Sequence, residues 1–204
     1  MRKNGTTEAA AKNAEGMYDK IFAESARVFK EKGYHAASMQ NIADAVGLQK
    51  GSLYHYISSK EQLLFKIFEH STGELTKQLE AISADNIPPT EKMRQAISAH
   101  LTALCEQLDI YTVYLAERRV LSGKYHAQVR AEAERHARLL EQIIEQGIRK
   151  KDFRPVDPKM AAHAILGMCN WLYQWYSPDG RLQPAEIAAI FSDLALDGLL
   201  RSRK

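Results

Sequence analysis

Cysteine is scarce in this 204-residue chain and long apolar runs are absent, which narrows the kind of protein it can be. The two cysteines, Cys105 and Cys169, lie far apart in apolar surroundings, so we expect buried free thiols and no disulfide framework. The longest apolar stretches are much shorter than a bilayer span, and the polar N-terminal residues contain no apolar segment of the signal-peptide kind. We therefore expect a cytoplasmic protein.

Motifs that would carry catalysis or bind a metal are missing too. The chain has no Gly-rich phosphate loop, no G-x-S-x-G and no H-E-x-x-H. Its seven histidines are scattered without the spacing of metal ligands. We therefore expect neither an enzyme nor a metal site, and no cofactor.

The apolar pattern is interrupted neither by proline nor by strand-like alternation. None of the six prolines falls inside a long apolar-periodic segment, and no segment keeps a period of two. Ser58 to Glu61 reads as a capping box S-x-x-E that starts the fourth helix. The chain is thus predicted to be all-α, with helices over residues 17–32, 39–46, 49–56, 60–82, 90–106, 110–122, 124–151, 157–176 and 184–201.

Positive charge is concentrated at one end of the chain. Residues 1–60 hold nine Lys and Arg against six Asp and Glu, whereas the remaining residues hold nineteen of each. The small polar residues and proline pair of Ser83 to Pro89 mark a domain boundary after this region. The excess of three charges is small, but its sign fits a phosphate-bearing partner for the first domain.

Two short helices joined at Gly47 form a predicted helix-turn-helix. The second helix, residues 49–56, is polar and aromatic, with Leu53 as its only aliphatic anchor. In this motif the second helix enters the DNA major groove, where Gln suits adenine, Lys suits guanine, and a glycine such as Gly51 lets the backbone approach closely. Side chains at helix ends and turns are expected to hold phosphates. The predicted DNA-binding residues are Ser38, Gln49, Lys50, Gly51, Ser52, Tyr54, His55 and Lys60.

The stretch "SMQNIADAVGLQKGSLYHYISSKEQLL" and the upstream "IFAESARVFKEKGYHAAS" resemble the DNA-binding domain of TetR-type transcriptional repressors. Several residue types agree at fixed spacing; one mild departure is Tyr56, which stands where Phe is commoner. The resemblance implies a DNA-binding domain over residues 1–62, with the fourth helix continuing to about residue 82. It implies an effector-binding and dimerisation domain over residues 83–204.

The same resemblance implies a homodimer formed by the last two helices. The final predicted helix agrees with this, because it mixes large apolar residues with alanines that allow close helix approach. The residues expected at the dimer interface are Ile187, Ile190, Phe191 and Leu194.

Two aromatic stretches are candidates for an effector site. "GMCNWLYQWYSPDGRL" and "IYTVYLAERR" combine aromatic rings with a few polar groups, which suits a mostly apolar ligand with a polar or anionic head. The first is similar to a segment of TetR-type regulators of fatty-acid, steroid or aromatic-acid catabolism, and that similarity implies an acyl-CoA effector. The expected effector residues are Tyr111, Tyr114, Leu115, Arg118, Met168, Trp171 and Trp175.

Blander interpretations stay open on the sequence alone. Trp171 and Trp175 are equally typical of a core or a dimer interface, and Arg118 and Arg119 of surface ion pairs. The whole chain is alternatively a multidrug-sensing repressor of hydrophobic compounds, or a helical protein-interaction module that does not bind DNA. Activation and repression are not distinguished.

Overall fold

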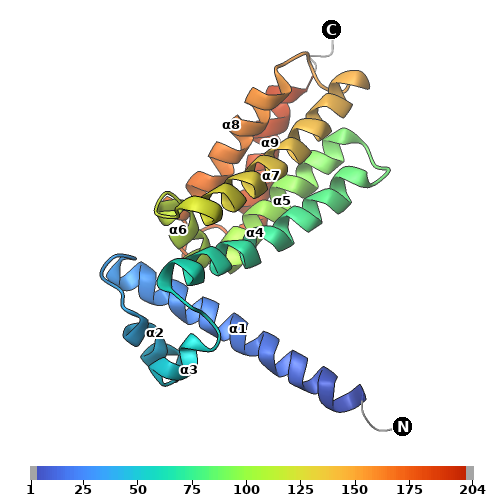
Figure 1. Cartoon of the computed structure of the whole chain (residues 1–204). Helices are drawn as coiled ribbons and strands as arrows, with labels where there is room; N and C mark the ends of the chain where they lie inside the picture. The colour runs from blue at the N-terminus through green and yellow to red at the C-terminus, as the bar shows by residue number, and fades with distance from the viewer. Residues whose placement is uncertain (1–3, 201–204) are drawn as a thin grey trace.

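The computed structural model describes residues 4–200, with side chains from Gly16 onward, and within that range the chain is built from helices alone (Figure 1). The all-α prediction is confirmed. A single short 3₁₀ helix, η1, follows the eighth α-helix. The elements are α1 (Asn4–Lys32), α2 (Met39–Val46), α3 (Lys50–Tyr54), α4 (Lys60–Ala84), α5 (Pro89–Glu106), α6 (Leu108–Glu117), α7 (Gly123–Arg149), α8 (Pro158–Asn170), η1 (Trp171–Gln174) and α9 (Pro184–Leu199).

Helices α1, α2 and α3 gather at one end of the molecule, and α4 leads from them into a bundle formed with α5, α7, α8 and α9 (Figure 1). Helix α6 lies at the junction and packs on α1 and α4. Apolar residues at helical spacing on each helix are buried against their neighbours, as with Ile42 of α2, Leu53 of α3 and Phe68 of α4. Helix α4 therefore belongs to both ends of the molecule.

The start of α4 differs by one residue from the predicted capping box. Ser59 is the N-cap, and its side chain accepts a hydrogen bond from the Gln62 backbone N–H. The Gln62 side chain in turn accepts from the N–H and the hydroxyl of Ser58. The prediction that paired Ser58 with Glu61 was wrong, and the correction leaves the Glu61 carboxylate free to bind elsewhere.

The helix predicted over residues 157–176 is shorter in the structure. Helix α8 ends at Asn170, and the chain tightens into η1, where the Trp175 N–H donates to the Leu172 carbonyl. Tight turns of this kind are common at helix ends, and they rotate the following side chains away from the helical register. Trp171 keeps the register of α8, because Asn170 is still α-helical, whereas Trp175 follows the 3₁₀ turn and leaves that register.

The end of α7 packs against the chain segment that leads to α8. The buried Phe153 ring lies directly on Gly147, where any Cβ atom would overlap the ring. The next residue, Arg154, donates from its backbone N–H to the Leu199 carbonyl at 2.8 Å and from Nε to the Gly198 carbonyl at 2.6 Å. The C-terminal end of α9 is thereby attached to the α7–α8 connection.

Candidate functional site

The turn between α2 and α3 is specified by local backbone chemistry. Ser38 caps α2 by accepting from the Asn41 N–H, while the Asn41 side chain accepts from the Ser38 N–H. Gly47 ends α2 with φ of 80°, a left-handed conformation that glycine adopts without steric cost. Leu53 is fully buried and anchors α3 to the small core. The two helices are thus held at a defined angle, and the face of α3 opposite Leu53 is not used for packing.

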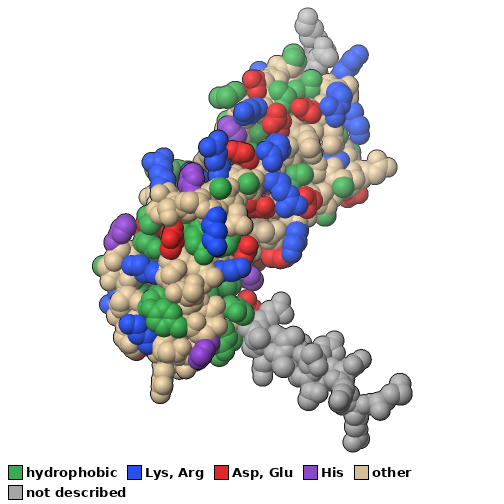
Figure 2. Space-filling model, viewed as in Figure 1, with side chains coloured by type: hydrophobic (Ala, Val, Ile, Leu, Met, Phe, Trp, Pro, Cys, Tyr) green, Lys and Arg blue, Asp and Glu red, His purple; other side chains and the backbone are tan. Residues whose placement is uncertain are grey.

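That remaining face of α3 carries the predicted reading residues. Gln49, Lys50, Tyr54 and His55 are exposed and Ser52 is partly exposed. Figure 2 shows lysine and arginine side chains at this end of the molecule, with few acidic side chains beside them on the visible face. The arrangement places an amide, an ammonium and a phenol on a protruding helix, which is suited to hydrogen bonding with base edges and phosphates.

Gly51 has no structural requirement within the protomer. A Cβ atom at this position would meet no atom within 4 Å, and its φ is not in the left-handed region. Neither packing nor backbone conformation within the described residues therefore demands glycine here. The predicted close approach of α3 to DNA would give glycine a role at this position.

Lys60 has a different role from the one predicted. Its ammonium group faces inward and donates three hydrogen bonds to carbonyls of the α1–α2 connection: Tyr34 at 2.7 Å, His35 at 3.2 Å and Ala37 at 2.8 Å. It also lies over the Tyr34 ring, 4.6 Å from the centroid. All three donors are in use, so the geometry assigns Lys60 to holding the helix-turn-helix on α4, and a direct phosphate contact is not needed to explain it.

The two ends of the molecule are joined by polar contacts as well as by α4. The Glu61 carboxylate accepts from the Ser122 N–H at 2.9 Å and from its hydroxyl at 2.8 Å, and these hydrogen bonds lower the pKa of Glu61. Lys30 of α1 pairs with Asp109 of α6 at 2.6 Å. Both contacts connect the helix-turn-helix end to the segment around α6.

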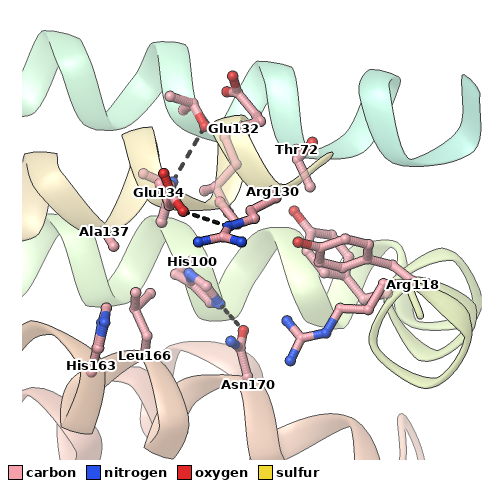
Figure 3. A pocket seen from close by; sticks show the side chains of 16 residues that line it. Thr72, His100, Arg118, Arg130, Glu132, Glu134, Ala137, His163, Leu166 and Asn170 are labelled. Carbon is pink, nitrogen blue, oxygen red and sulfur yellow. Dashed lines mark hydrogen bonds and ion pairs between the residues drawn. The ribbon is translucent and has the colours of Figure 1, made fainter. Parts of the chain in front are cut away.

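A cavity of about 350 Å³ lies inside the bundle, between α4, α5, α6, α7 and α8 (Figure 3). Three predicted effector residues, Tyr111, Tyr114 and Arg118, line it. The volume is at the small end of the range for ligand pockets. The other lining residues are Thr72, Leu75, Thr76, His100, Arg130, Glu132, Ala133, Glu134, His136, Ala137, His163, Leu166 and Asn170.

Four predicted effector residues do not line this cavity. Leu115 packs against the core on another side of α6, and Met168 lines a separate groove between α8 and α9. Trp171 and Trp175 are 62% and 51% exposed, the first at the end of α8 and the second after the 3₁₀ turn. The structure therefore does not bring the seven residues together: the aromatic rings that line this cavity come from α6 and not from the segment after α8.

The cavity wall contains a polar cluster that the sequence did not reveal. The imidazole of His100 is 2.9 Å from the Asn170 side-chain oxygen through Nε2, and His136 Nδ1 is 3.4 Å from the Thr76 hydroxyl. Burial lowers the pKa of His100 to about 4 and that of His136 to about 3, so both rings are neutral at pH 7. The sequence does contain one indication of this cluster: His100 occupies an inward position on the apolar face of α5, beside Leu101.

Cations collect where this cavity meets a smaller hollow of about 190 Å³. Arg118 and Arg130 border both spaces, and Arg119 and His126 border the smaller one. Arg130 pairs with Glu134 at 2.8 Å, whereas Arg118 and Arg119 form no ion pair among the described side chains. Burial raises the pKa of Tyr114, and the neighbouring Arg118 guanidinium opposes that rise. Free guanidinium groups at a cavity mouth are suited to phosphate.

An apolar face without a partner runs along α8 and α9. Ile190 and Leu194, two predicted dimer residues, are 45% and 61% exposed, and Met160 of α8 is 63% exposed. Phe191 is partly buried and packs near the Trp175 ring. Ile187 is only 2% exposed and belongs to the protomer's own core, so its assignment to the interface is corrected.

Two family models match this chain. The model described as bacterial regulatory proteins, tetR family, matches residues 21–67, and the one described as tetracyclin repressor-like, C-terminal domain, matches residues 86–199. The chain belongs to the TetR family. It is therefore a DNA-binding transcriptional regulator with a helix-turn-helix domain and a ligand-binding domain.

Solved structures of TetR-family regulators share its fold. PfmR from Thermus thermophilus is 35% identical with a TM-score of 0.82, covering 89% of this chain and 99% of PfmR. AibR, described in complex with isovaleryl coenzyme A and operator DNA, is 32% identical with a TM-score of 0.79, covering 87% of this chain and 97% of AibR.

A relative is also found by sequence. The HTH-type transcriptional repressor KstR2 of Mycolicibacterium smegmatis is 24% identical over 187 residues, 91% of each chain.

Two further features concern the described residues. None of their helices is both long enough and apolar enough to cross a bilayer. Among the side chains that the structure describes, no group of three or more His, Cys, Asp and Glu is placed to hold a metal ion.

Proposed function

We propose that this TetR-family protein is a repressor that binds a pseudo-palindromic operator as a homodimer and is released by an acyl-CoA. The observation that carries the effector class is the cavity of about 350 Å³ bordered by Arg118, with Arg119 in the adjoining hollow and neither arginine in an ion pair among the described side chains. A small cavity with apolar side chains in its wall suits an acyl group, and guanidinium groups suit the phosphates of CoA. AibR, a relative at 32% identity, is described with isovaleryl coenzyme A and operator DNA.

Dimerisation rests on the exposed apolar face of α8 and α9. Met160, Ile190 and Leu194 are large side chains left in water, and a groove of about 280 Å³ lined by Met168 and Leu194 runs between the two helices. Pairing two such faces about a twofold axis would bury them in a four-helix interface, for which a stable dimer needs about 1,000 Å² in total. Two α3 helices would then address two half-sites about 34–36 Å apart.

Release is proposed to pass through α4. Thr72 and Thr76 of this helix line the cavity, while Lys60 at its start holds the helix-turn-helix. At 1.5 Å per residue the two ends of this lever are about 24 Å apart, so a small tilt at the cavity is enlarged at α3. An effector that favours the tilted state tenfold changes DNA affinity by about 1.4 kcal/mol.

The test starts with an operator selected from random-sequence DNA. Acyl-CoAs of different chain length are titrated into the protein–operator complex, and release is followed by fluorescence anisotropy. We expect a short acyl-CoA to release the DNA, and Arg118→Ala to raise the concentration needed by about tenfold, the loss of one charge-assisted contact. Arg149→Ala serves as the matched control, because Arg149 is an exposed arginine paired with Glu145 at the far end of α7.

Two outcomes would contradict the proposal in different ways. Release by uncharged hydrophobic compounds, with no acyl-CoA effective and no change in Arg118→Ala, would make the chain a multidrug-sensing repressor. Absence of any selected operator would leave a helical interaction module and would overturn the DNA-binding role itself.

A further inference from the structure

Two buried polar atoms in the cavity wall have no hydrogen-bond partner. They are Nδ1 of His100 and Oε1 of Glu132, from α5 and α7. A buried polar atom without a partner is costly and uncommon, so each needs an explanation. Both residues line the same cavity, which suggests that a ligand supplies what the protein does not.

The orphaned atom of His100 is a hydrogen-bond acceptor. Its other ring nitrogen, Nε2, lies 2.9 Å from the side-chain oxygen of Asn170, and since that oxygen only accepts, Nε2 carries the proton. Burial keeps the ring neutral at pH 7, with the pKa of His100 lowered to about 4. Nδ1 therefore presents a lone pair, and a hydrogen-bond donor for it would have to come from outside the chain.

The second orphan has the same polarity. Oε1 of Glu132 is a carboxyl oxygen that accepts, and the other oxygen of this side chain is 3.5 Å from the Arg135 guanidinium. Among the described side chains that line the cavity, both unpaired buried atoms thus call for a donor. A plain hydrocarbon acyl group has no donor to offer, and a carbonyl oxygen would face a lone pair.

The depth of His100 shows which part of the effector would reach it. His100 is only 6% exposed and lies between Asn170 and Arg130 in Figure 3, with the apolar Ala137 and Leu166 to one side. The arginines at the mouth are exposed, and Glu132 is two residues from Arg130. A ligand whose phosphates pair with the exposed arginines would therefore direct its other, acyl end toward His100.

We propose that the effector's acyl group carries a hydroxyl that donates to His100 Nδ1, so that the effector is a short hydroxyacyl thioester. This rests on the acyl-CoA proposal above. His100 then acts as a specificity-determining residue: the unpaired acceptor disfavours a saturated or oxo acyl group in the same position and is satisfied by a hydroxyl. Rejection by an unpaired buried group is a stronger selector than the shape of an apolar wall.

The test compares ligands that differ only in one functional group. Calorimetry on the wild-type protein measures the Kd of butyryl-CoA, its 2-, 3- and 4-hydroxy derivatives, and acetoacetyl-CoA, in which a carbonyl replaces the 3-hydroxyl. We expect at least one hydroxy derivative to bind about tenfold more tightly than butyryl-CoA, the size of one net hydrogen bond. Acetoacetyl-CoA should bind no more tightly than butyryl-CoA.

His100→Phe keeps a ring and removes both nitrogens. In this variant the advantage of the hydroxy derivative should vanish while butyryl-CoA still binds. His163→Phe is the matched control, because His163 lines the same cavity but is exposed, and the hydroxyl preference should persist there. If His100→Phe fails to fold, the ligand series on the wild-type protein decides by itself.

The possible failures are distinguishable. If butyryl-CoA releases the operator and no hydroxy derivative gains affinity, the hydroxyl proposal is overturned and the acyl-CoA proposal stands. Equal affinity for the oxo and hydroxy ligands, or an equal loss for every acyl-CoA in His100→Phe, would likewise overturn it, because the acceptor would not be reading the acyl group. If no acyl-CoA binds, both proposals fall.

Discussion

Replacing Gly51 by alanine should separate the stability of the protein from its affinity for DNA. A methyl group at this position meets no atom within 4 Å in the free protein, and the backbone is helical. Alanine loses less conformational entropy than glycine on entering a helix, so the free energy of unfolding should stay equal or rise by up to about 1 kcal/mol. The free protein therefore has no reason to resist the change.

On DNA the same methyl group should be costly. If α3 enters the major groove with Gly51 at the closest backbone approach, the added carbon forces the helix outward and strains the contacts beside it. Overpacking of a tight contact costs about 1–3 kcal/mol, which corresponds to a Kd about 5- to 150-fold weaker. Fluorescence anisotropy with the selected operator and a thermal melt of the same preparation measure both quantities.

Gly73→Ala is the matched control for this experiment. Gly73 lies within α4, well away from α3, and a methyl group there also meets nothing within 4 Å. Operator affinity of this variant, measured without effector, should equal that of the wild type. Wild-type operator affinity in Gly51→Ala would refute the placement of α3 in the groove, and a lowered melting temperature would show that glycine is required inside the protomer after all.

Three further changes test other features. Lys60→Met should lower the free energy of unfolding by about 1–3 kcal/mol in thermal melts, because it leaves three carbonyls unpaired. Lys50→Ala should leave the melt unchanged and relax base preference in a binding selection by about 1–3 kcal/mol. The reverse pattern would restore Lys60 as a phosphate contact. Leu194→Asp should give monomers by analytical ultracentrifugation and abolish operator binding, since Leu194 is 61% exposed on the proposed interface; a persistent dimer would point to another face. His100 has a folded-state pKa of about 4 against 6.5 in the unfolded chain, so the unfolded state binds more protons between these values, and His100 should contribute a fall in stability of about 3 kcal/mol as the pH drops from 6.5 to 4. Burial lowers the pKa of His136 as well, so melts of His100→Phe should keep part of the fall; an equally steep fall in that variant would assign the pH dependence to other groups.

Most of the fold was predictable because the helical periodicity of apolar residues indicates which side chains are buried. Ile42 and Leu53 sit at the spacing of a buried face and are buried, and Gly47 provides the left-handed turn that its position demands. The exposure of residues 49–55 was predictable in the same way, since a helix with a single aliphatic anchor must turn its other side chains outward. The exposed face of α3 is what that pattern required.

The proposed effector cavity was less predictable because it is formed where five helices converge. Tyr114 and Leu115 are neighbours on α6, yet about 100° of helical rotation places only the first in the cavity wall. Which of two adjacent apolar residues faces a cavity depends on the position of the partner helices, and that information is not in the local sequence. The position of Trp175 was unpredictable for a related reason, because apolar periodicity does not show where an α-helix tightens into a 3₁₀ turn.

Lys60 illustrates a third limit. A lysine at the start of a helix in a DNA-binding domain looks free, because sequence spacing does not show that the carbonyls of residues 34, 35 and 37 converge on it. Long-range polar contacts of this kind, including the one between Glu61 and Ser122, depend on the folded chain.

The close fit of Phe153 on Gly147 has a consequence for how two protomers would respond to effector. Helix α7, which supplies Glu132 and His136 to the cavity wall, ends at this contact, and the residue after Phe153 is bonded to the last turn of α9. In the proposed dimer, α9 lies against its copy, so a ligand that displaces α7 would also move α9 at the dimer interface. Binding at the first cavity would then alter the affinity of the second, and the operator would respond to effector concentration with a Hill coefficient different from one.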